Sequence, residues 1–354
     1  MVNIRNWQLE VPIIQGGMGV GVSLGNLAGA VAHAGGMGVV STVNAGYREA
    51  DFNRNPLNAN LRALKQEITK AKDMAQGNGL VAINIMVAVN HYEETVRAAV
   101  EAGVQAIISG AGLPMELPSF VDNNEVALAP IVSSGKAAKT IMRYWEKKHN
   151  RLPDFIVIEG PMAGGHLGFK RDEIEGGTAK NTSEILQEVL IEIAEFEEKY
   201  KSKIPVFVGG GVFDGSDMAS LIAQGASGVQ IGTRFIATKE CDASEEYKNV
   251  IISAKEEDVV IIKSPVGMPG RSIRTPLIKR LEEGISLPPN CCNDCLKACP
   301  HGNKTPYCIS RALIEAVKGN YEEGLFFCGA NVGRINTMTT VPQLIDEIMT
   351  EYNK

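Results

Sequence analysis

Eight short apolar runs recur along the first two thirds of this 354-residue chain, and each closes on glycine or small polar residues. The runs are rich in Val and Ile and carry few polar side chains. This pattern is typical of parallel strands buried on both faces, because helices cover one face of such a sheet and the core covers the other. The runs span residues 11–17, 38–42, 80–85, 104–112, 128–135, 154–160, 204–211 and 227–233.

The segments between these runs have the pattern of crossover helices. The clearest examples cover residues 91–103, 182–200 and 216–226. Eight strand–helix units in about 240 residues match the unit count and the length of a (β/α)8 TIM barrel. A doubly wound open sheet is the alternative, but eight consecutive units without an obvious reversal favour a closed barrel.

The alternation of strands and helices stops after Thr238, so we predict an α/β fold in two parts. Residues 1–240 form the (β/α)8 barrel. Residues 241–354 form a C-terminal extension, with a cysteine-rich segment, that packs on the barrel and is a candidate to cover its mouth.

Composition and charge exclude several classes of partner. The chain has 35 basic and 41 acidic residues and no basic block, which argues against a nucleic-acid partner. The most apolar run, residues 80–89, is too short for a bilayer, and the first 17 residues lack the apolar segment of a signal peptide. Seven cysteines, an odd number, argue against a secreted disulfide framework. We therefore expect a cytoplasmic protein without membrane contact.

Polar residues and glycines occur where the apolar runs end. In a barrel of parallel strands, the loops that follow the strands converge at one end and form the active site. The sequence therefore predicts a shared rim that contains Gln15, Asn84, Ser109, Ser133, Glu159 and residues 209–211.

Two glycine turns predict an anion site on this rim. Gly209, Gly210 and Gly211 follow the seventh run, and Gly232 follows the eighth. Glycines let backbone N–H groups approach an anion, and a helix that begins at such a turn adds its dipole. The alternative is that the glycines only permit tight turns, and the glycine pairs at 16–17 and 35–36 are open to the same interpretation.

Two side chains are candidates for direct contact with a ligand. Asn84 interrupts an apolar strand near its end, so it bonds either to neighbouring backbone or to a ligand. His166 lies in the stretch EGPMAGGHLG, residues 159–168, where the flanking glycines predict open space around the ring. A neutral imidazole near its ordinary pKa is a competent acid or base, so we predict that His166 is catalytic; the alternative is a histidine that bonds its own loop.

Several of these segments together resemble a known family. Residues 12–19, 35–42, 84–87, 159–168 and 209–238 are similar to the signature segments of the nitronate monooxygenase family, to which flavin-dependent enoyl-acyl-carrier-protein reductase II is closely related. The resemblance implies FMN as cofactor, a small-molecule substrate, and His166 as the residue that orients the anionic nitro group or acts as base for neutral nitroalkanes. The cofactor-binding residues that the resemblance implies are Gly17, Met18, Asn84, Gly210, Gly211, Gln230, Gly232 and Thr233. Lys136 and Gly165 are two further candidates.

The activity implied by the resemblance is oxidation of alkyl nitronates with O2 to carbonyl compounds and nitrite. An NAD(P)H-dependent reduction of an enoyl-type acceptor is the alternative, although Pro161 and Ala163 depart from the usual reductase pattern. A flavin or nucleotide sensor without catalysis is a third hypothesis. A homodimer is left open.

The extension adds two further questions. Its thiols at 292, 295, 299 and 308 have spacings that suit a metal ion or cluster, but they do not form a complete ferredoxin pattern, and we predict packed thiols without metal. Arg271 and Arg274 are available for an anionic substrate, although surface arginines that bond loop carbonyls explain the pattern better.

Overall fold

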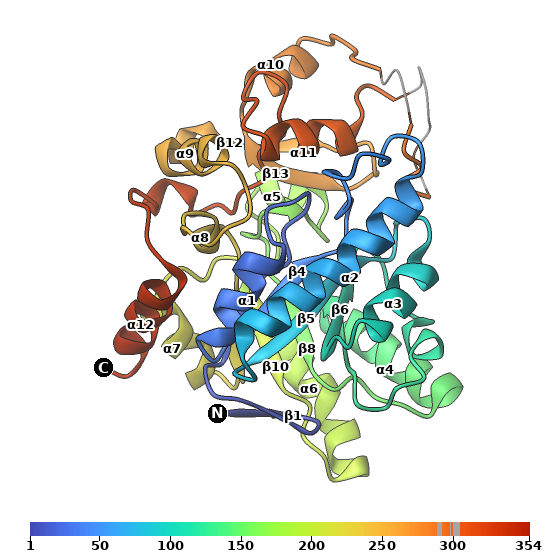
Figure 1. Cartoon of the computed structure of the whole chain (residues 1–354). Coiled ribbons are helices and arrows are strands. Elements are labelled where there is room, and N and C mark those ends of the chain that lie inside the picture. The colour runs from blue at the N-terminus through green and yellow to red at the C-terminus, as the bar shows by residue number, and fades with distance from the viewer. Residues whose placement is uncertain (289–291, 298, 300–304) are drawn as a thin grey trace.

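The computed structural model describes residues 1–288, 292–297, 299 and 305–354, and its centre is a closed barrel of eight parallel strands (Figure 1). Each strand pairs in parallel with both neighbours, and the last strand pairs with the first, so the predicted (β/α)8 barrel is confirmed and the open sheet is excluded. In chain order the strands are β3 (Ile13–Gln15), β4 (Met37–Ser41), β5 (Leu80–Met86), β6 (Ala106–Gly110), β7 (Ala127–Val132), β8 (Ile156–Glu159), β10 (Val206–Gly209) and β11 (Gly228–Ile231).

Helices surround the barrel where the sequence predicts crossovers. Several begin at side-chain caps that occupy free backbone N–H groups: Asn181 and Asp214 both form capping boxes, and Ser134 accepts from Ala137 N–H. The helices between strands are α1 (Gly25–His33), α2 (Pro56–Ala75), α3 (Tyr92–Glu101), α4 (Gly135–His149), α5 (Arg171–Glu175), α6 (Thr182–Tyr200) and α7 (Gly215–Ala223).

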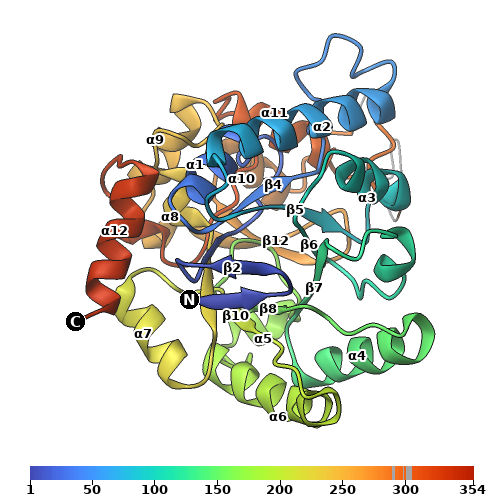
Figure 2. The same cartoon turned by 60° about the horizontal axis from the view of Figure 1, so that its bottom comes forward.

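The outer ring is completed by the end of the chain. Helix α12 (Val341–Tyr352) packs against α7 and against α1, which is the place of the helix that would follow the eighth strand (Figure 2). Only the short helix α8 (Thr233–Ile236) follows β11 directly. The division of the chain at residue 240 stays a prediction, but the extension contributes one wall helix.

The interior of the barrel is filled and closed at its lower end. Ile14, Met37 and Phe207 belong to the cluster inside the strands. A hairpin of β1 (Val2–Ile4) and β2 (Trp7–Leu9) lies across this end and adds Ile4 and Leu9, both fully buried, to the same cluster (Figure 2). Access for a ligand is therefore confined to the opposite end, where the strands terminate.

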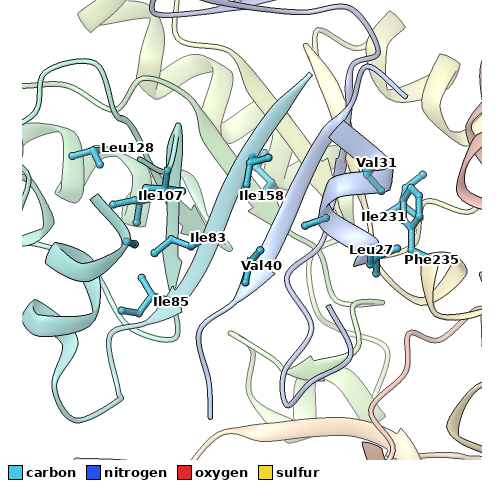
Figure 3. Packing of buried hydrophobic residues seen from close by; sticks show 14 of the residues in the cluster. Leu27, Val31, Val40, Ile83, Ile85, Ile107, Leu128, Ile158, Ile231 and Phe235 are labelled. Atoms are coloured by element: carbon cyan, nitrogen blue, oxygen red, sulfur yellow. The ribbon is translucent and has the colours of Figure 1, made fainter. Parts of the chain in front are cut away.

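A second apolar layer joins the strands to the helices. Leu27 and Val31 of α1 lie near Val40, Ile231 and Phe235, as Figure 3 shows. The layer is thin at Gly38, where a Cβ atom would lie 1.8 Å from the carbonyl oxygen of Ala28. Helix α1 therefore rests directly on the backbone of β4.

The extension lies over the upper end of the barrel (Figure 1). Its β12 (Val259–Lys263) and β13 (Pro269–Ile273) pair antiparallel, and β13 also pairs with the two-residue strand β9 (Gly165–His166) from the loop after β8. The loop that carries His166 is thus built into the sheet of the extension. The helices of this part are α9 (Glu245–Ser253), α10 (Pro276–Glu282) and α11 (Ile309–Val317).

None of the helices in the described parts of the chain combines the length and the apolar character that crossing a membrane requires.

Candidate active site

A cavity of about 730 Å³ lies between the strand ends and the extension. It is lined by loops that follow the barrel strands and by extension residues such as Phe327 and Asn331. All but one of the predicted site residues line it: Gly17, Met18, Asn84, Gly165, His166, Gly210, Gly211, Gln230, Gly232 and Thr233. Residues from motifs that lie far apart in the sequence, from Gly17 to Thr233, therefore line one cavity.

Three residues expected near this space lie elsewhere. Lys136 is exposed in the first turn of α4 and does not line the cavity. Gln15, expected on the rim, is fully buried and accepts a hydrogen bond from Val39 N–H at 2.9 Å. Ser109 is fully buried and bonds to the Tyr92 hydroxyl at 2.7 Å. Both rim predictions failed because these polar groups connect barrel elements to each other.

The glycine turn after β10 exposes backbone to the cavity. Gly210 and Gly211 have φ values of +89° and +119°, which side chains other than glycine rarely adopt. A Cβ atom on Gly210 would lie 2.6 Å from the carbonyl oxygen of Gly160. Gly232 after β11 faces open space: among the described residues, the Met18 sulfur atom, at 3.7 Å, is the one atom within 4 Å of where its Cβ would be. This arrangement leaves room for an anionic group against main-chain N–H groups.

Another part of the cavity wall is formed by Gly17 and two amides. A Cβ atom on Gly17 would lie 2.3 Å from the Cβ of Asn84, so the backbone of the first loop lies directly on that side chain. Asn84 and Gln230 are both half-buried and line the cavity. A flat ligand can therefore lie on bare backbone, with two amide groups at its edge.

His166 is held by the extension on two sides. Its Nε2 atom lies 2.8 Å from the Ser264 hydroxyl oxygen, and its ring meets the Phe327 ring edge-on, with 5.2 Å between centroids. Burial lowers the pKa of His166 to about 4, because it disfavours the charged form. The imidazole is therefore neutral at neutral pH.

The glycines around His166 also allow close contact with the barrel and the extension. A Cβ on Gly164 would lie 2.5 Å from the carbonyl carbon of Cys328, and Gly165 has a φ of +74°. On the other side, a Cβ on Gly168 would lie 2.6 Å from the Ser133 hydroxyl oxygen. The expected open space lies on the cavity side of the loop, which Gly164, Gly165, His166 and Gly168 line, while the other sides of the loop pack against the barrel and the extension.

Arg271 fixes the same loop from β13. The residue is 7% exposed. Its guanidinium group donates to the carbonyl oxygen of Pro161 at 2.8 Å and to the carbonyl oxygen of Ala163. Burial lowers the pKa of Arg271. The expected bonding to loop carbonyls is confirmed for Arg271, although the residue is buried rather than at the surface. Arg274 is paired with Glu282 instead, and neither arginine lines the cavity.

Glu159 at the end of β8 also lines the cavity. Its Oε2 atom accepts a hydrogen bond from Gly168 N–H at 3.0 Å. Burial raises the pKa of Glu159 to about 7, although the Gly168 hydrogen bond and the charge of Arg271 oppose the rise. A carboxyl group with a pKa raised to about 7 and a neutral imidazole therefore line the same cavity.

The thiols of the extension influence one another. Burial and the neighbouring thiols of Cys308, Cys299 and Cys292 raise the pKa of Cys295 to about 12. Within the described ranges, no group of three or more His, Cys, Asp or Glu side chains is arranged to hold a metal ion. Cys291 and His301 lie outside the described residues.

The residues that sequence reasoning missed come mainly from the extension. Ser264 contacts His166, Phe327 packs on its ring, and Asn331 donates through Nδ2 to the carbonyl oxygen of Gly211 at 2.8 Å. These residues lie in segments without a strand–helix pattern. Nothing in their local sequence indicates which end of the barrel they contact.

Comparison with known proteins identifies the family. A family model described as nitronate monooxygenase matches residues 3–351, which is nearly the whole chain. The chain belongs to the nitronate monooxygenase family. The family resemblance predicted from the motifs is therefore confirmed, and it extends beyond residue 240 into the extension.

Curated relatives carry more than one activity in their names. A (3aS,4S,5R,7aS)-5-hydroxy-7a-methyl-1-oxo-octahydro-1H-indene-4-carboxyl-CoA dehydrogenase of Rhodococcus jostii is 23% identical, over 98% of this chain and 94% of the relative. A probable nitronate monooxygenase of Staphylococcus saprophyticus is 24% identical, over 78% of this chain and 79% of the relative. Family membership thus fixes the enzyme class more firmly than the substrate.

Solved structures share the fold over almost the whole chain. FabK from Thermotoga maritima is 26% identical, with a TM-score of 0.72, and the match covers 98% of this chain and 93% of FabK. Nitroalkane oxidase from Streptomyces ansochromogenes is 19% identical, with a TM-score of 0.71, and the match covers 98% and 96% of the two chains. The second likeness concerns the fold alone.

Proposed function

We propose that the chain is an FMN-dependent oxidoreductase that oxidises alkyl nitronates with O2 to carbonyl compounds and nitrite. One observation carries this proposal: the neutral imidazole of His166 lines the same cavity as the glycine turns after β10 and β11. A ligand with an anionic tail in those turns would have its other end near the imidazole. Membership of the nitronate monooxygenase family supports the same reaction class.

The cavity fits the parts of FMN. The bare backbone at Gly210, Gly211 and Gly232 suits a phosphate, because a Cβ atom at these positions would be strained or would fill the cradle. The backbone at Gly17 suits a flat ring, and the amides of Asn84 and Gln230 offer both donors and acceptors for its polar edge. Thr233, Met18 and Gly165 stay candidates for further contacts, while the exposed Lys136 is no longer one. When bound, FMN supplies the electron acceptor that the protein side chains lack.

His166 would act on the substrate as a neutral hydrogen-bond donor. A nitronate carries its negative charge on the nitro oxygens. A neutral imidazole N–H group can therefore orient the nitronate by donating a hydrogen bond to one of these oxygens. Since the pKa of His166 is lowered to about 4, the imidazole stays neutral over the range in which nitronates are anionic. Residues of the extension, such as Phe327 and Asn331, line the cavity in which this contact would form.

An NAD(P)H-dependent reductase of the enoyl-acyl-carrier-protein reductase II type is the second candidate. The observation in its favour is the match to FabK, which is closer in sequence than the match to nitroalkane oxidase. The dehydrogenase from Rhodococcus jostii acts, by its name, on a CoA ester, which is also a thioester. In that reaction His166 would donate its hydrogen bond to the carbonyl oxygen of the acceptor.

An anaerobic titration distinguishes the two reactions. We expect yellow protein that is bleached by propionate-3-nitronate and only slowly by NADH or NADPH. Bleaching by a nicotinamide cofactor, with no effect of the nitronate, would favour the reductase. Slow bleaching by every donor would favour a sensor without catalysis. A cytoplasmic location and a homodimer stay predictions.

The role of His166 has its own test. His166→Ala should retain the flavin but lose turnover by about a hundredfold or more, because the group that acts on the reacting atoms is removed. Full activity in this variant, at unchanged flavin content, would remove His166 from the mechanism.

A further inference from the structure

Ser264 lies at the start of the turn between β12 and β13 and is 2% exposed. Its N–H donates to the carbonyl oxygen of Met268 at 3.2 Å, and its own carbonyl oxygen accepts from Gly267 N–H at 3.0 Å. The backbone on both sides of the side chain is therefore fixed by the turn. The hydroxyl group is presented to the loop of His166 in one position.

Two groups contact this hydroxyl. His166 Nε2 lies 2.8 Å from Ser264 Oγ, and Val266 N–H donates to the same oxygen at 3.3 Å. Of these two groups, His166 Nε2 is the one that can accept a proton.

The number of protons decides the direction of these bonds. A serine hydroxyl has one proton to donate and two lone pairs that accept. Val266 N–H can only donate, so it takes one lone pair. Ser264 is 2% exposed, so its buried proton needs an acceptor. Among the described residues, His166 Nε2 is the acceptor within hydrogen-bond distance, so the proton of Ser264 is directed to that nitrogen.

We propose that Ser264 is a positioning residue that holds His166 in the tautomer with its proton on Nδ1, and so turns that N–H toward the substrate. Among the described residues, Nδ1 has no hydrogen-bond partner, while Nε2 is engaged by Ser264. Which nitrogen of a histidine carries the proton is set by the bond that the other nitrogen makes. The inference rests on the proposed function and deepens it, because it defines the chemical group that meets the ligand.

The fixed tautomer has a consequence for the substrate. An imidazole that presents Nδ1–H donates to an oxygen but has no lone pair there with which to remove a proton. The site therefore selects ligands that already carry an electron-rich oxygen, such as a nitronate, over neutral nitroalkanes, which must first lose a proton from carbon. This excludes the role of His166 as base for neutral nitroalkanes in the resting enzyme.

The tautomer can be measured directly in the purified protein with its flavin. Histidine labelled with ¹⁵N gives ring signals that distinguish Nδ1–H from Nε2–H, and His166→Gln identifies which signals belong to His166. We expect the Nδ1–H form in the wild-type protein and a large gain of the Nε2–H form in Ser264→Ala. Ser264→Ala should also lower kcat/KM for a nitronate by about tenfold, less than His166→Ala does.

Ser310→Ala is the matched control. Ser310 is also a buried serine of the extension, but its hydroxyl accepts from Asn44 Nδ2 at 2.6 Å. This variant should leave the His166 signals unchanged. An Nε2–H tautomer in the wild-type protein, or an unchanged Nδ1–H tautomer in Ser264→Ala, would overturn the proposal. Both of these results come from the ring signals and do not depend on turnover. A fully active His166→Ala variant would instead contradict the proposed function, and the tautomer of His166 could still be measured in the wild-type protein.

Discussion

Glu159→Gln tests whether the cavity holds a carboxyl group with a displaced pKa. Burial raises the pKa of Glu159 from an ordinary value of 4.5 to about 7. Between these two values the folded protein binds more protons than the unfolded chain, so the free energy of unfolding falls as the pH rises. Glutamine cannot ionise, and the variant should lack this part of the pH dependence.

The size of the effect follows from the two pKa values. Each pKa unit corresponds to about 1.4 kcal/mol, so a carboxyl group whose pKa moves from 4.5 to about 7 loses at most about 3 kcal/mol of stability above neutral pH. The side chain is half-buried rather than fully enclosed, so 3 kcal/mol is an upper limit. The destabilisation is absent below the ordinary pKa and complete above the raised one.

Urea unfolding at about pH 5 and about pH 8 measures this difference. The wild-type protein should lose up to about 2.5 kcal/mol more than Glu159→Gln between the two conditions, because part of the effect is already present at pH 5. Glu198→Gln, which changes an exposed carboxyl group of α6, should behave as the wild type does. Parallel pH dependence in the wild-type protein and Glu159→Gln would refute the reasoning, because it would mean that the carboxyl group ionises normally. The kcat/KM profile provides a second readout, in which an ionisation near neutrality should disappear from the variant.

Three further substitutions test the cradle, the loop and the extension. Gly210→Ala places a Cβ atom 2.6 Å from Gly160, so it should weaken flavin retention by about tenfold or more, as measured by flavin fluorescence after dialysis; normal retention would contradict the assignment of the cradle. Arg271→Ala frees two loop carbonyls and should lower kcat by about tenfold while flavin content stays unchanged; unchanged kcat would show that the loop holds His166 without it. Asp242→Ala removes a carboxylate that accepts from three backbone N–H groups at the start of α1, so urea unfolding should show a loss of about 2 kcal/mol; a loss below about 0.5 kcal/mol would exclude this capping role.

The barrel could be predicted from the sequence because its signal is local and repeated. Each strand is an apolar run with a glycine or polar end, and such a run needs no knowledge of distant residues to be recognised. The same rule placed Asn84 and the glycine turn after β10 at the open end, since every parallel strand ends there. It failed for Gln15 and Ser109, because a polar residue at a strand end can also point sideways and bond a neighbouring element.

The surroundings of His166 could not be predicted, because they depend on pairs of residues far apart in the chain. Ser264 is 98 residues away from His166, and Phe327 lies further still. A glycine-rich loop has the same sequence whether its glycines leave space or permit contact. The structure shows both: the loop pairs with β13 and contacts Cys328 and Ser133, and the same glycines line the cavity.

The position of the extension nevertheless follows from how the chain is anchored. Residues 237–340 begin where α8 leaves the open end of the barrel and finish where α12 returns to its wall between α7 and α1. A segment with both ends fixed to the barrel samples far fewer positions than a domain on a free linker, so covering the nearby mouth costs little additional entropy. Family members with this arrangement can therefore change the residues that meet the histidine and the substrate without altering the barrel strands that hold the cofactor. We expect the substrate preference of this chain to be determined mainly by the segment that contains Ser264 and Phe327.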